Sequence, residues 1–185
     1  GAVRFPNQAQ MNPVKFLYGL VEDIEKSDKV TIFEEMPVDD WVNGTTWSGL
    51  HITIPKNIIC ATHFPFYKKA GAYNNKLYQN RSYIMALDHV PEIRGMYADA
   101  SNSGLALRGY KDMIGGATHR VGQEKRDWNE FREKILSYYP EAMEREHWEV
   151  EDCVSLDGIP YIGPYSDKTP NMYVATGFNG WGMTS

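Results

Sequence analysis

Only two segments of the 185-residue chain carry apolar residues at the spacing of an amphipathic helix. The first covers residues 13–27, with Asn12 as its expected N-cap and Pro13 at its first helical position. The second covers residues 127–139, where Asp127 and Glu130 resemble a capping box, and the proline that follows ends it. Short β-type runs between Gly, Pro, Asn and Asp breakers fill the rest. The pattern predicts an α+β fold with an antiparallel or mixed sheet and flanking helices.

The expected strands are rich in β-branched and aromatic residues. In the first part of the chain they cover residues 30–35, 47–54 and 58–61. The last of these is wholly apolar, so we expect a strand that is buried on both faces. Further strands are expected at residues 81–89, 94–98, 104–110, 111–117, 145–154 and 172–175.

Composition limits the class of partner. The net charge is −5 and no basic cluster interrupts the sequence, which argues against nucleic acid. No apolar run approaches the roughly 20 residues that span a bilayer, and no secretory signal opens the sequence. We therefore expect a cytoplasmic protein with no membrane partner. Aromatic residues make up 13% of the chain, which is typical of a large core or of a surface that binds a cofactor.

The cysteines and histidines indicate no metal site. Cys60 and Cys153 are far apart and neither belongs to a CxxC pair, so we expect two reduced, half-buried thiols, with a disulfide or a reactive thiol as the alternative. None of the five histidines has the spacing of a zinc ligand.

The residues that follow the last expected strand have an unusual composition. Gly177, Gly180 and Gly182 fall within six positions. Glycine lets backbone N–H groups approach a flat or anionic ligand closely, and a helix that begins near Trp181 would direct its positive end at that ligand. An electron-poor ring that becomes anionic on reduction would suit such a loop. The alternative is a Gly-rich turn at a strand end.

Two C-terminal stretches resemble the flavin-binding signature of the D-amino-acid oxidase/glycine oxidase superfamily of FAD-dependent oxidoreductases. Residues 157–163 read Asp-Gly-Ile-Pro-Tyr-Ile-Gly and match the spacing D-x-x-P-x-I-G, while residues 177–182 match G-x-x-x-x-G. Residues 58–62 resemble the family strand that leads into the flavin site, and residues 7–20 resemble the segment that opens the substrate domain. The resemblance extends in order over nearly the whole chain.

The resemblance implies a division of the chain and a set of FAD contacts. Residues 3–56 and 64–150 would form the substrate-binding domain, and residues 57–63 and 151–185 would be elements of the FAD-binding domain. The implied cofactor-binding residues lie in three segments and are Ala61, Thr62, His63, Gly158, Pro160, Gly177, Phe178, Asn179, Gly180, Trp181, Gly182, Met183 and Thr184.

One departure concerns the nucleotide end of FAD. The sequence contains no GxGxxG fingerprint followed by an acidic residue about 20 positions later. We therefore expect that the N-terminal dinucleotide-binding half is not part of this chain, and that the chain alone is inactive and does not hold FAD tightly. We also expect an exposed apolar patch that contains Phe178 or Trp181, with self-association through it.

A second departure concerns the substrate. The family's amino-acid oxidases place an Arg five residues before the matched Asp157, where it binds the substrate carboxylate, and here that position is Asp152. A carboxylate repels a carboxylate and attracts an ammonium group. The substitution implies a substrate that presents a second amine or lacks the usual carboxylate contact. Residues 148–152 also resemble the subgroup in which a Rieske iron–sulfur domain follows, although this sequence has no Cys/His cluster for one.

The implied activity is oxidation of a C–N bond of an amine or amino acid to an imine, with FAD doing the chemistry. Besides Asp152, the candidate substrate contacts are Arg108, His119, Tyr83 and Tyr97. The alternative for each is structural: Arg108 would be a solvated strand residue, His119 a surface or structural histidine, and the two tyrosines core residues with a hydrogen-bonded hydroxyl. Polyamine-like or N-methylated amines are alternative substrates. Outside the enzymes, the alternative is a cofactor-free binding or interaction module that kept the substrate-domain fold.

Overall fold

The computed structural model describes residues 2–4, 7, 9–42, 45–49, 51–92, 94–99, 104–109, 113–123 and 127–183. They form two compact units. Unit 1 combines Gly1–Ala9 with Leu77–Val154, and unit 2 combines Gln10–Lys76 with Ser155–Ser185. These units differ from the expected functional division, because unit 2 also contains residues 10–56 and 64–76. The assignment of substrate-binding and FAD-binding parts stays a prediction.

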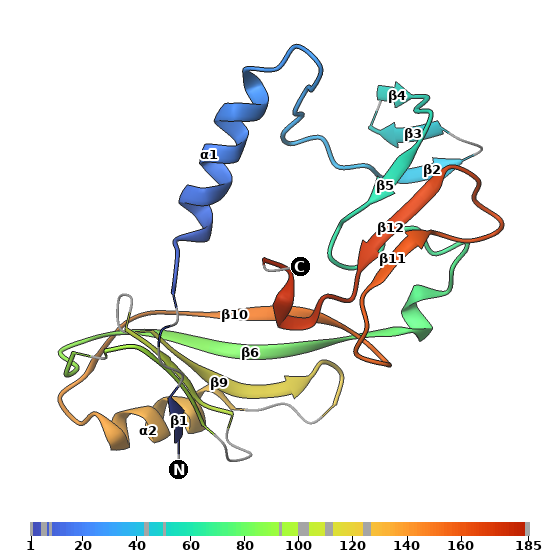
Figure 1. Cartoon of the computed structure of the whole chain (residues 1–185). Helices are drawn as coiled ribbons and strands as arrows, with labels where there is room; N and C mark the ends of the chain where they lie inside the picture. The colour runs from blue at the N-terminus through green and yellow to red at the C-terminus, as the bar shows by residue number, and fades with distance from the viewer. Residues whose placement is uncertain are drawn as a thin grey trace. The chain divides into compact units, whose positions relative to one another are not determined.

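Unit 1 is built on a six-stranded sheet with the order β1-β7-β8-β9-β6-β10 (Figure 1). The pairs β1–β7, β7–β8, β8–β9 and β9–β6 are antiparallel. The long strands β6 and β10 lie next to each other, and β10 forms one edge of the described sheet. The strands are β1 (Ala2–Arg4), β6 (Leu77–Asp88), β7 (Met96–Asp99), β8 (Ala106–Arg108), β9 (Met113–Arg120) and β10 (Met143–Ser155).

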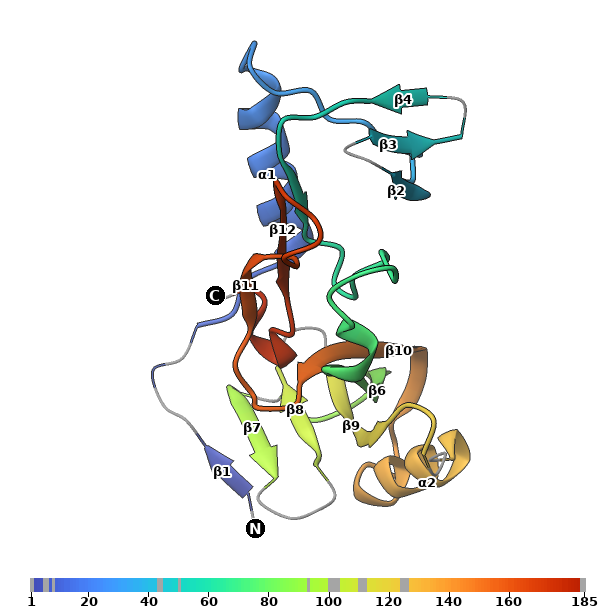
Figure 2. The same ribbon diagram turned by 90° about the vertical axis from the view of Figure 1, so that its right-hand side faces the viewer.

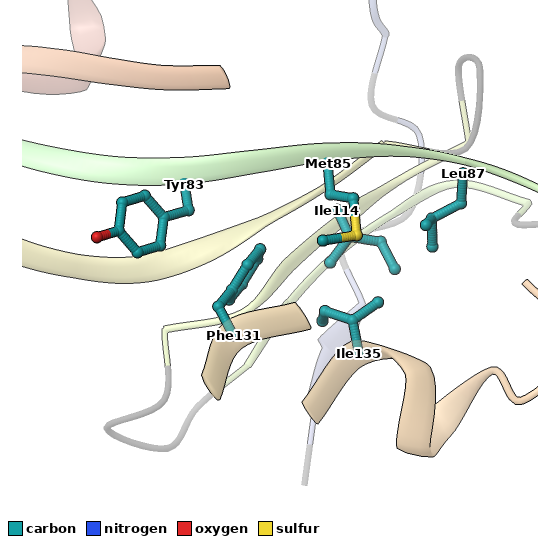
Figure 3. Packing of buried hydrophobic residues seen from close by; sticks show 6 residues of the cluster. All are labelled: Tyr83, Met85, Leu87, Ile114, Phe131 and Ile135. Carbon is teal, nitrogen blue, oxygen red and sulfur yellow. The ribbon is translucent and has the colours of Figure 1, made fainter. Parts of the chain in front are cut away.

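The core of unit 1 lies between this sheet and helix α2 (Trp128–Tyr138). Phe131 and Ile135 of α2 point toward the sheet, as expected from the apolar stripe of the helix (Figure 3). The strand residues that they meet are Tyr83, Met85, Leu87 and Ile114. The predicted N-cap is confirmed, because the Asp127 side chain accepts a hydrogen bond from the backbone N–H of Asn129 at 2.8 Å.

A glycine lets α2 approach the sheet closely. A Cβ atom at Gly116 would lie 2.8 Å from Cδ2 of Leu105 and 3.2 Å from Cε2 of Phe131. A side chain at this position would therefore require the Leu105 side chain to move and the Phe131 ring to shift. Figure 2 shows α2 lying along the β9 and β10 side of this unit.

Unit 2 contains two small three-stranded sheets. One has the order β2-β3-β4 and is antiparallel. The other has the order β11-β12-β5, in which β11 and β12 are antiparallel and β12 and β5 are parallel (Figure 1). The elements are α1 (Pro13–Glu25), β2 (Asp40–Val42), β3 (Thr45–Ser48), β4 (His51–Thr53), β5 (Ile58–Cys60), the 3-10 turns η1 (Tyr73–Asn75) and η2 (Asn179–Trp181), β11 (Tyr161–Pro164) and β12 (Met172–Thr176).

Helix α1 begins where the sequence predicts. Asn12 accepts hydrogen bonds from the backbone N–H groups of Val14 and Lys15, and Pro13 occupies the first helical position. None of its residues is buried, although its apolar stripe is present. No helix among the described residues is both long and apolar enough to cross a membrane.

Three sequence expectations about unit 2 are wrong. Residues 30–35 form no strand, because β-branched residues need a paired, packed neighbour and Val30, Ile32 and Phe33 are exposed. Residues 47–54 are not one strand, since Gly49 turns the chain at φ +54° between β3 and β4. Strand β5 is not buried on both faces, because 72% of Ile59 is exposed.

A helix that begins near Trp181, which would direct its positive end at a ligand, is absent from the described residues. The chain forms the short turn η2 there, and residues up to Met183 form no α-helix. Strand β11 was not expected, since its Gly and Pro residues are typical of a loop. It forms because its register with β12 pairs Tyr161 with Thr176 and Pro164 with Tyr173.

Candidate functional site

Three segments of unit 2 meet at one edge of the β11-β12-β5 sheet. Strands β5 and β12 are parallel, with Val174 opposite Cys60, so both deliver the chain to the same edge. Strand β11 begins there, because Tyr161 pairs with Thr176. Residues 61–63, 157–160 and 177–183 therefore lie at this edge, which we call the carboxyl edge (Figure 1). In open sheets with parallel strands, ligands bind beyond the carboxyl ends of the strands.

The backbone at the carboxyl edge is held in uncommon conformations. His63 has φ +62° and Asn179 has φ +54°, both in the left-handed region that non-glycine residues seldom adopt. Each such residue costs about 1–3 kcal/mol and persists only where its surroundings fix it. Gly177 has φ +76° and so needs to be glycine for its own conformation. Residues in such conformations cluster at functional sites.

Two further glycines have no such reason among the residues that the structure describes. A Cβ atom at Gly180 would meet nothing within 4 Å, and one at Gly182 would meet only the Cβ of Phe178 at 3.8 Å. Neither residue has a positive φ. The two glycines therefore leave open space beside the backbone that the described part of the chain does not fill. That space suits a ligand that approaches the main chain closely.

The side chains of this loop agree with an apolar ligand surface. Trp181 is 68% exposed and Met183 is 49% exposed, while Phe178 is half-buried. The expected exposure of Phe178 or Trp181 is thus confirmed for Trp181. Exposed rings of this size next to a backbone opening are typical of a binding surface.

Two buried tyrosines of unit 2 are hydrogen-bonded through their hydroxyl groups. The hydroxyl of Tyr73 donates to the carbonyl oxygen of Tyr165 at 3.1 Å, and the hydroxyl of Tyr165 donates to the carbonyl oxygen of Tyr67 at 2.5 Å. Burial raises the pKa of Tyr165 far above its ordinary value, and burial also raises the pKa of Tyr73. Both phenols therefore stay protonated and keep these bonds. They link the segments that contain Tyr67, Tyr73 and Tyr165.

The structure brings the sequence-predicted cofactor residues together. Ala61, Thr62 and His63 follow β5, Gly158 and Pro160 precede β11, and Gly177 to Met183 follow β12. Thr184 lies outside the described residues. The sequence analysis missed Thr176, which is buried at the end of β12 and whose hydroxyl donates to the carbonyl oxygen of His63 at 2.5 Å. A threonine at a buried strand position next to the glycine loop was the available signal.

The predicted substrate residues all belong to unit 1, on five different strands. Tyr83 is 1% exposed and stacks on Trp128, so it is part of the core. The hydroxyl of Tyr97 donates to the carbonyl oxygen of Arg94 at 2.9 Å, and Nδ1 of His119 lies 2.9 Å from the carbonyl oxygen of Ala117. Tyr83 thus agrees with its structural alternative, a core tyrosine, whereas Tyr97 and His119 are half-buried and Tyr97 is not part of the core. A role in substrate binding stays an untested prediction.

Arg108 and Asp152 lie on the other face of that sheet. Alternate strand residues point to opposite faces. Arg108 pairs with Met113, which pairs with Ala86, between the core residues of β6. Asp152 follows Glu151, which binds Arg81 on the same face as the core. Both candidates therefore face away from α2.

The sheet keeps these two residues apart. Arg108 is level with Ala86 of β6, whereas Asp152 lies beside the residue that binds Arg81. The two residues are separated by five positions along β6, at about 3.3 Å each, and by three strand spacings of about 4.8 Å. Their Cα atoms are therefore roughly 20 Å or more apart. One small substrate cannot contact both.

Residues 1–185 match the family model described as DAO, FAD dependent oxidoreductase.
The chain belongs to this family of FAD-dependent oxidoreductases.
A Bacillus subtilis (strain 168) protein named "Putative Rieske 2Fe-2S iron-sulfur protein YhfW" is 35% identical in an alignment of 201 residues that covers 100% of this chain and 39% of that protein. The resemblance drawn from the motifs is therefore confirmed, together with the link to a Rieske-named relative.

Two solved structures share the fold. Glycine oxidase from Geobacillus kaustophilus aligns with a TM-score of 0.59 and 15% identity over 80% of this chain and 44% of that chain. L-proline dehydrogenase from P. horikoshii aligns with a TM-score of 0.55 and 17% identity over 79% of this chain and 44% of that chain. The α+β fold class is confirmed. The chain spans less than half the length of each of these relatives.

The FAD of the family can be compared with the carboxyl edge. The open backbone at Gly180 and Gly182 and the exposed Trp181 suit the flat flavin ring. The adenine dinucleotide end needs a strand, a GxGxxG turn and a helix, and the sequence has no such fingerprint. The residues present therefore fit the flavin end of the cofactor.

Proposed function

We propose that this chain forms the flavin-facing edge and the substrate-facing sheet of an FAD-dependent oxidoreductase that oxidises a C–N bond of an amine or amino acid to an imine. The observation that carries the proposal is the meeting of residues 61–63, 157–160 and 177–183 at the carboxyl edge. The names of the structural neighbours support the reaction class, since glycine oxidase, L-proline dehydrogenase and iminodiacetate oxidase all act on amino-acid-like amines.

The residues of the carboxyl edge would have different roles in binding the flavin ring. Bound FAD supplies the chemistry, because it accepts the hydride equivalent from the carbon beside the amine nitrogen. The backbone at Gly180 and Gly182 would lie against the ring, and Trp181 and Met183 would keep water away from it. His63 and Asn179 are fixed in left-handed conformations and would determine the direction in which residues 61–63 and 177–183 leave the sheet. No acid or base side chain at this edge is needed for the reaction.

We propose that Asp152 selects the substrate. It occupies the position where the family's amino-acid oxidases carry an Arg, on the face of the unit 1 sheet that α2 does not cover. A carboxylate there favours an ammonium group over a carboxylate. We therefore propose substrates with a second amine, such as diamines or polyamine-like compounds. Arg108 is too far along the sheet to bind the same small molecule.

The test uses the full-length protein that contains this chain, purified without added cofactor. Flavin absorbance, and its bleaching by an amine under anaerobic conditions, would support the proposal. A panel of glycine, N-methylated amines and diamines then identifies the substrate class. Asp152→Asn is expected to lower kcat/KM for a diamine by about 10- to 100-fold, as for loss of a charge-assisted contact of about 1.5–3 kcal/mol.

The matched control is Glu146→Gln, an exposed acid on the same strand. It should leave kcat/KM unchanged, because it removes the same charge at a distance from Asp152. A full-length protein that never binds flavin would contradict the proposal and favour the cofactor-free module. A flavoprotein in which Asp152→Asn behaves as wild type would retain the oxidoreductase assignment and remove the substrate assignment.

A further inference from the structure

Thr176 is a buried polar residue at the point where β12 enters the glycine loop. Its exposed fraction is 1%, and it pairs across the sheet with Tyr161. A buried hydroxyl costs free energy unless it is hydrogen-bonded, so valine would be the simpler residue for this shape. The hydroxyl is bonded here, because it donates to the carbonyl oxygen of His63 at 2.5 Å.

This bond joins two segments that are 113 residues apart in the sequence. The backbone pairing of β5 with β12 runs from Met172–Ile58 to Val174–Cys60. Beyond that pair β5 ends, whereas β12 continues beside β11 to Thr176, and the bond from Thr176 to His63 connects the two segments there. It therefore sets the spacing between residues 61–63 and residues 177–183.

The bond also acts on a strained turn. His63 has φ +62°, which is an unfavourable conformation for a side chain with a Cβ atom. The hydroxyl of Thr62 donates to the carbonyl oxygen of Phe64 at 3.0 Å, and Sγ of Cys60 lies 3.4 Å from that hydroxyl. These two contacts are local. The bond from Thr176 holds the carbonyl group of the strained residue itself from another strand.

We propose that Thr176 is a positioning residue that fixes the two flavin-facing segments relative to each other without touching the flavin. The inference rests on the proposed function of the carboxyl edge. Loss of the hydroxyl releases the His63 carbonyl group, lets residues 61–63 relax, and changes the surroundings of the ring.

The experiment compares Thr176→Val and Thr176→Ser in the full-length protein. We measure the visible absorption spectrum of the bound flavin, its reduction potential and the Kd for FAD. Thr176→Val keeps the shape and removes the donor, so it should shift the absorption band and raise the Kd about tenfold, which corresponds to one lost hydrogen bond. Thr176→Ser keeps the donor and should retain the wild-type spectrum and potential.

Thr169→Val is the matched control. Thr169 is 2% exposed, and its hydroxyl donates to the carbonyl oxygen of Ser166 at 3.1 Å. It lies between β11 and β12, at the end of the sheet opposite the carboxyl edge. Its loss should lower stability to a similar extent but leave the flavin spectrum, potential and Kd unchanged.

The outcomes separate this inference from the proposed function. If wild type binds flavin and Thr176→Val changes its spectrum no more than Thr169→Val does, Thr176 is merely structural and the inference is overturned. If wild type binds no flavin, both the proposed function and the inference fail. Should Thr176→Val not fold, Thr176→Ala against Thr176→Ser provides the same comparison, and equal spectra in that pair also overturn the inference.

Discussion

The indole ring of Trp128 stacks on the phenol ring of Tyr83, with ring centroids 4.2 Å apart and planes inclined by 19°. Trp128 is the first residue of α2, and its Nε1 donates to Glu149 of β10 at 3.2 Å. The pair therefore ties the start of the helix to two neighbouring strands. It explains why a tyrosine that the sequence offered as a substrate contact is part of the core.

Removal of this ring should destabilise unit 1. We expect Trp128→Ala to lower the free energy of unfolding by about 3 kcal/mol, through lost burial and the lost ring contact. Tyr138→Ala, on the same helix with an exposed ring, should change it by no more than about 0.5 kcal/mol. Urea titrations followed by far-UV circular dichroism measure both. Equal losses would mean that the ring pair contributes little.

The exposed face of the β11-β12-β5 sheet should drive self-association of this chain. Ile59 and Ile162 are 72% and 71% exposed, and the alternation of β12 places Tyr173 on the same side. Ile59→Thr together with Ile162→Thr should reduce binding of a hydrophobic dye and the apparent mass in solution. Stability should stay within about 0.5 kcal/mol of wild type, because these side chains bury little on folding.

Met172→Ala is the contrasting variant for this face. Met172 is fully buried on the other side of the same sheet. Its truncation should cost about 2–5 kcal/mol and leave dye binding by the native state unchanged. Light scattering and dye fluorescence at several concentrations measure association. Unchanged association in the double threonine variant would exclude this face as the contact.

Acid should weaken the contact between α2 and β10. Nε of Arg132 lies 2.5 Å from Oε2 of Glu144, and this hydrogen bond, more than any other contact, holds the pKa of Glu144 below its ordinary value of 4.5. A carboxyl whose pKa is lowered on folding adds stability above pH 4.5, and this is lost as the pH falls through the lowered pKa.

We therefore expect Glu144→Gln to be less stable than wild type at neutral pH and equal to it in strong acid. Melting temperatures at a series of pH values measure the difference. Glu146→Gln, on the same strand and exposed, should show no pH-dependent difference. A difference in melting temperature between Glu144→Gln and wild type that stays constant down to low pH would contradict the proposed link between Glu144 ionisation and stability.

Ser155 should tolerate loss of its hydroxyl. The residue is buried at the end of β10, and its Oγ has no hydrogen-bond partner among the described residues. Ser155→Ala removes the cost of a buried, unpaired group, so stability should stay the same or rise by about 1 kcal/mol. Thr169→Val loses a hydrogen-bonded hydroxyl, so its free energy of unfolding should fall by about 1 kcal/mol. Thermal unfolding of the two variants measures both changes in stability. A clear loss of stability in Ser155→Ala would mean that the Ser155 hydroxyl is hydrogen-bonded in solution.

The sequence predicted the elements whose signals are local. The caps at Asn12 and Asp127, both helices and most strands of unit 1 were predicted within a few residues, because capping and periodicity act within one or two turns of chain. The same local signals did not predict the strands of unit 2 correctly. Residues 30–35 have the composition of a strand but no partner among the described residues, and β11 has the composition of a loop but a partner in β12.

For the candidate site, the sequence by itself determined the residue types and their order. This order was enough to identify the family and to predict the three cofactor-binding segments. Only the tertiary structure decided that these segments share one edge, because the parallel pairing of β5 with β12 joins residues far apart in the chain. It also decided that Arg108 and Asp152 are too far apart for one ligand, and that Thr176 reaches His63. Sheet register and a hydrogen bond across 113 residues depend on how strands pack, and no local pattern in the sequence encodes that packing.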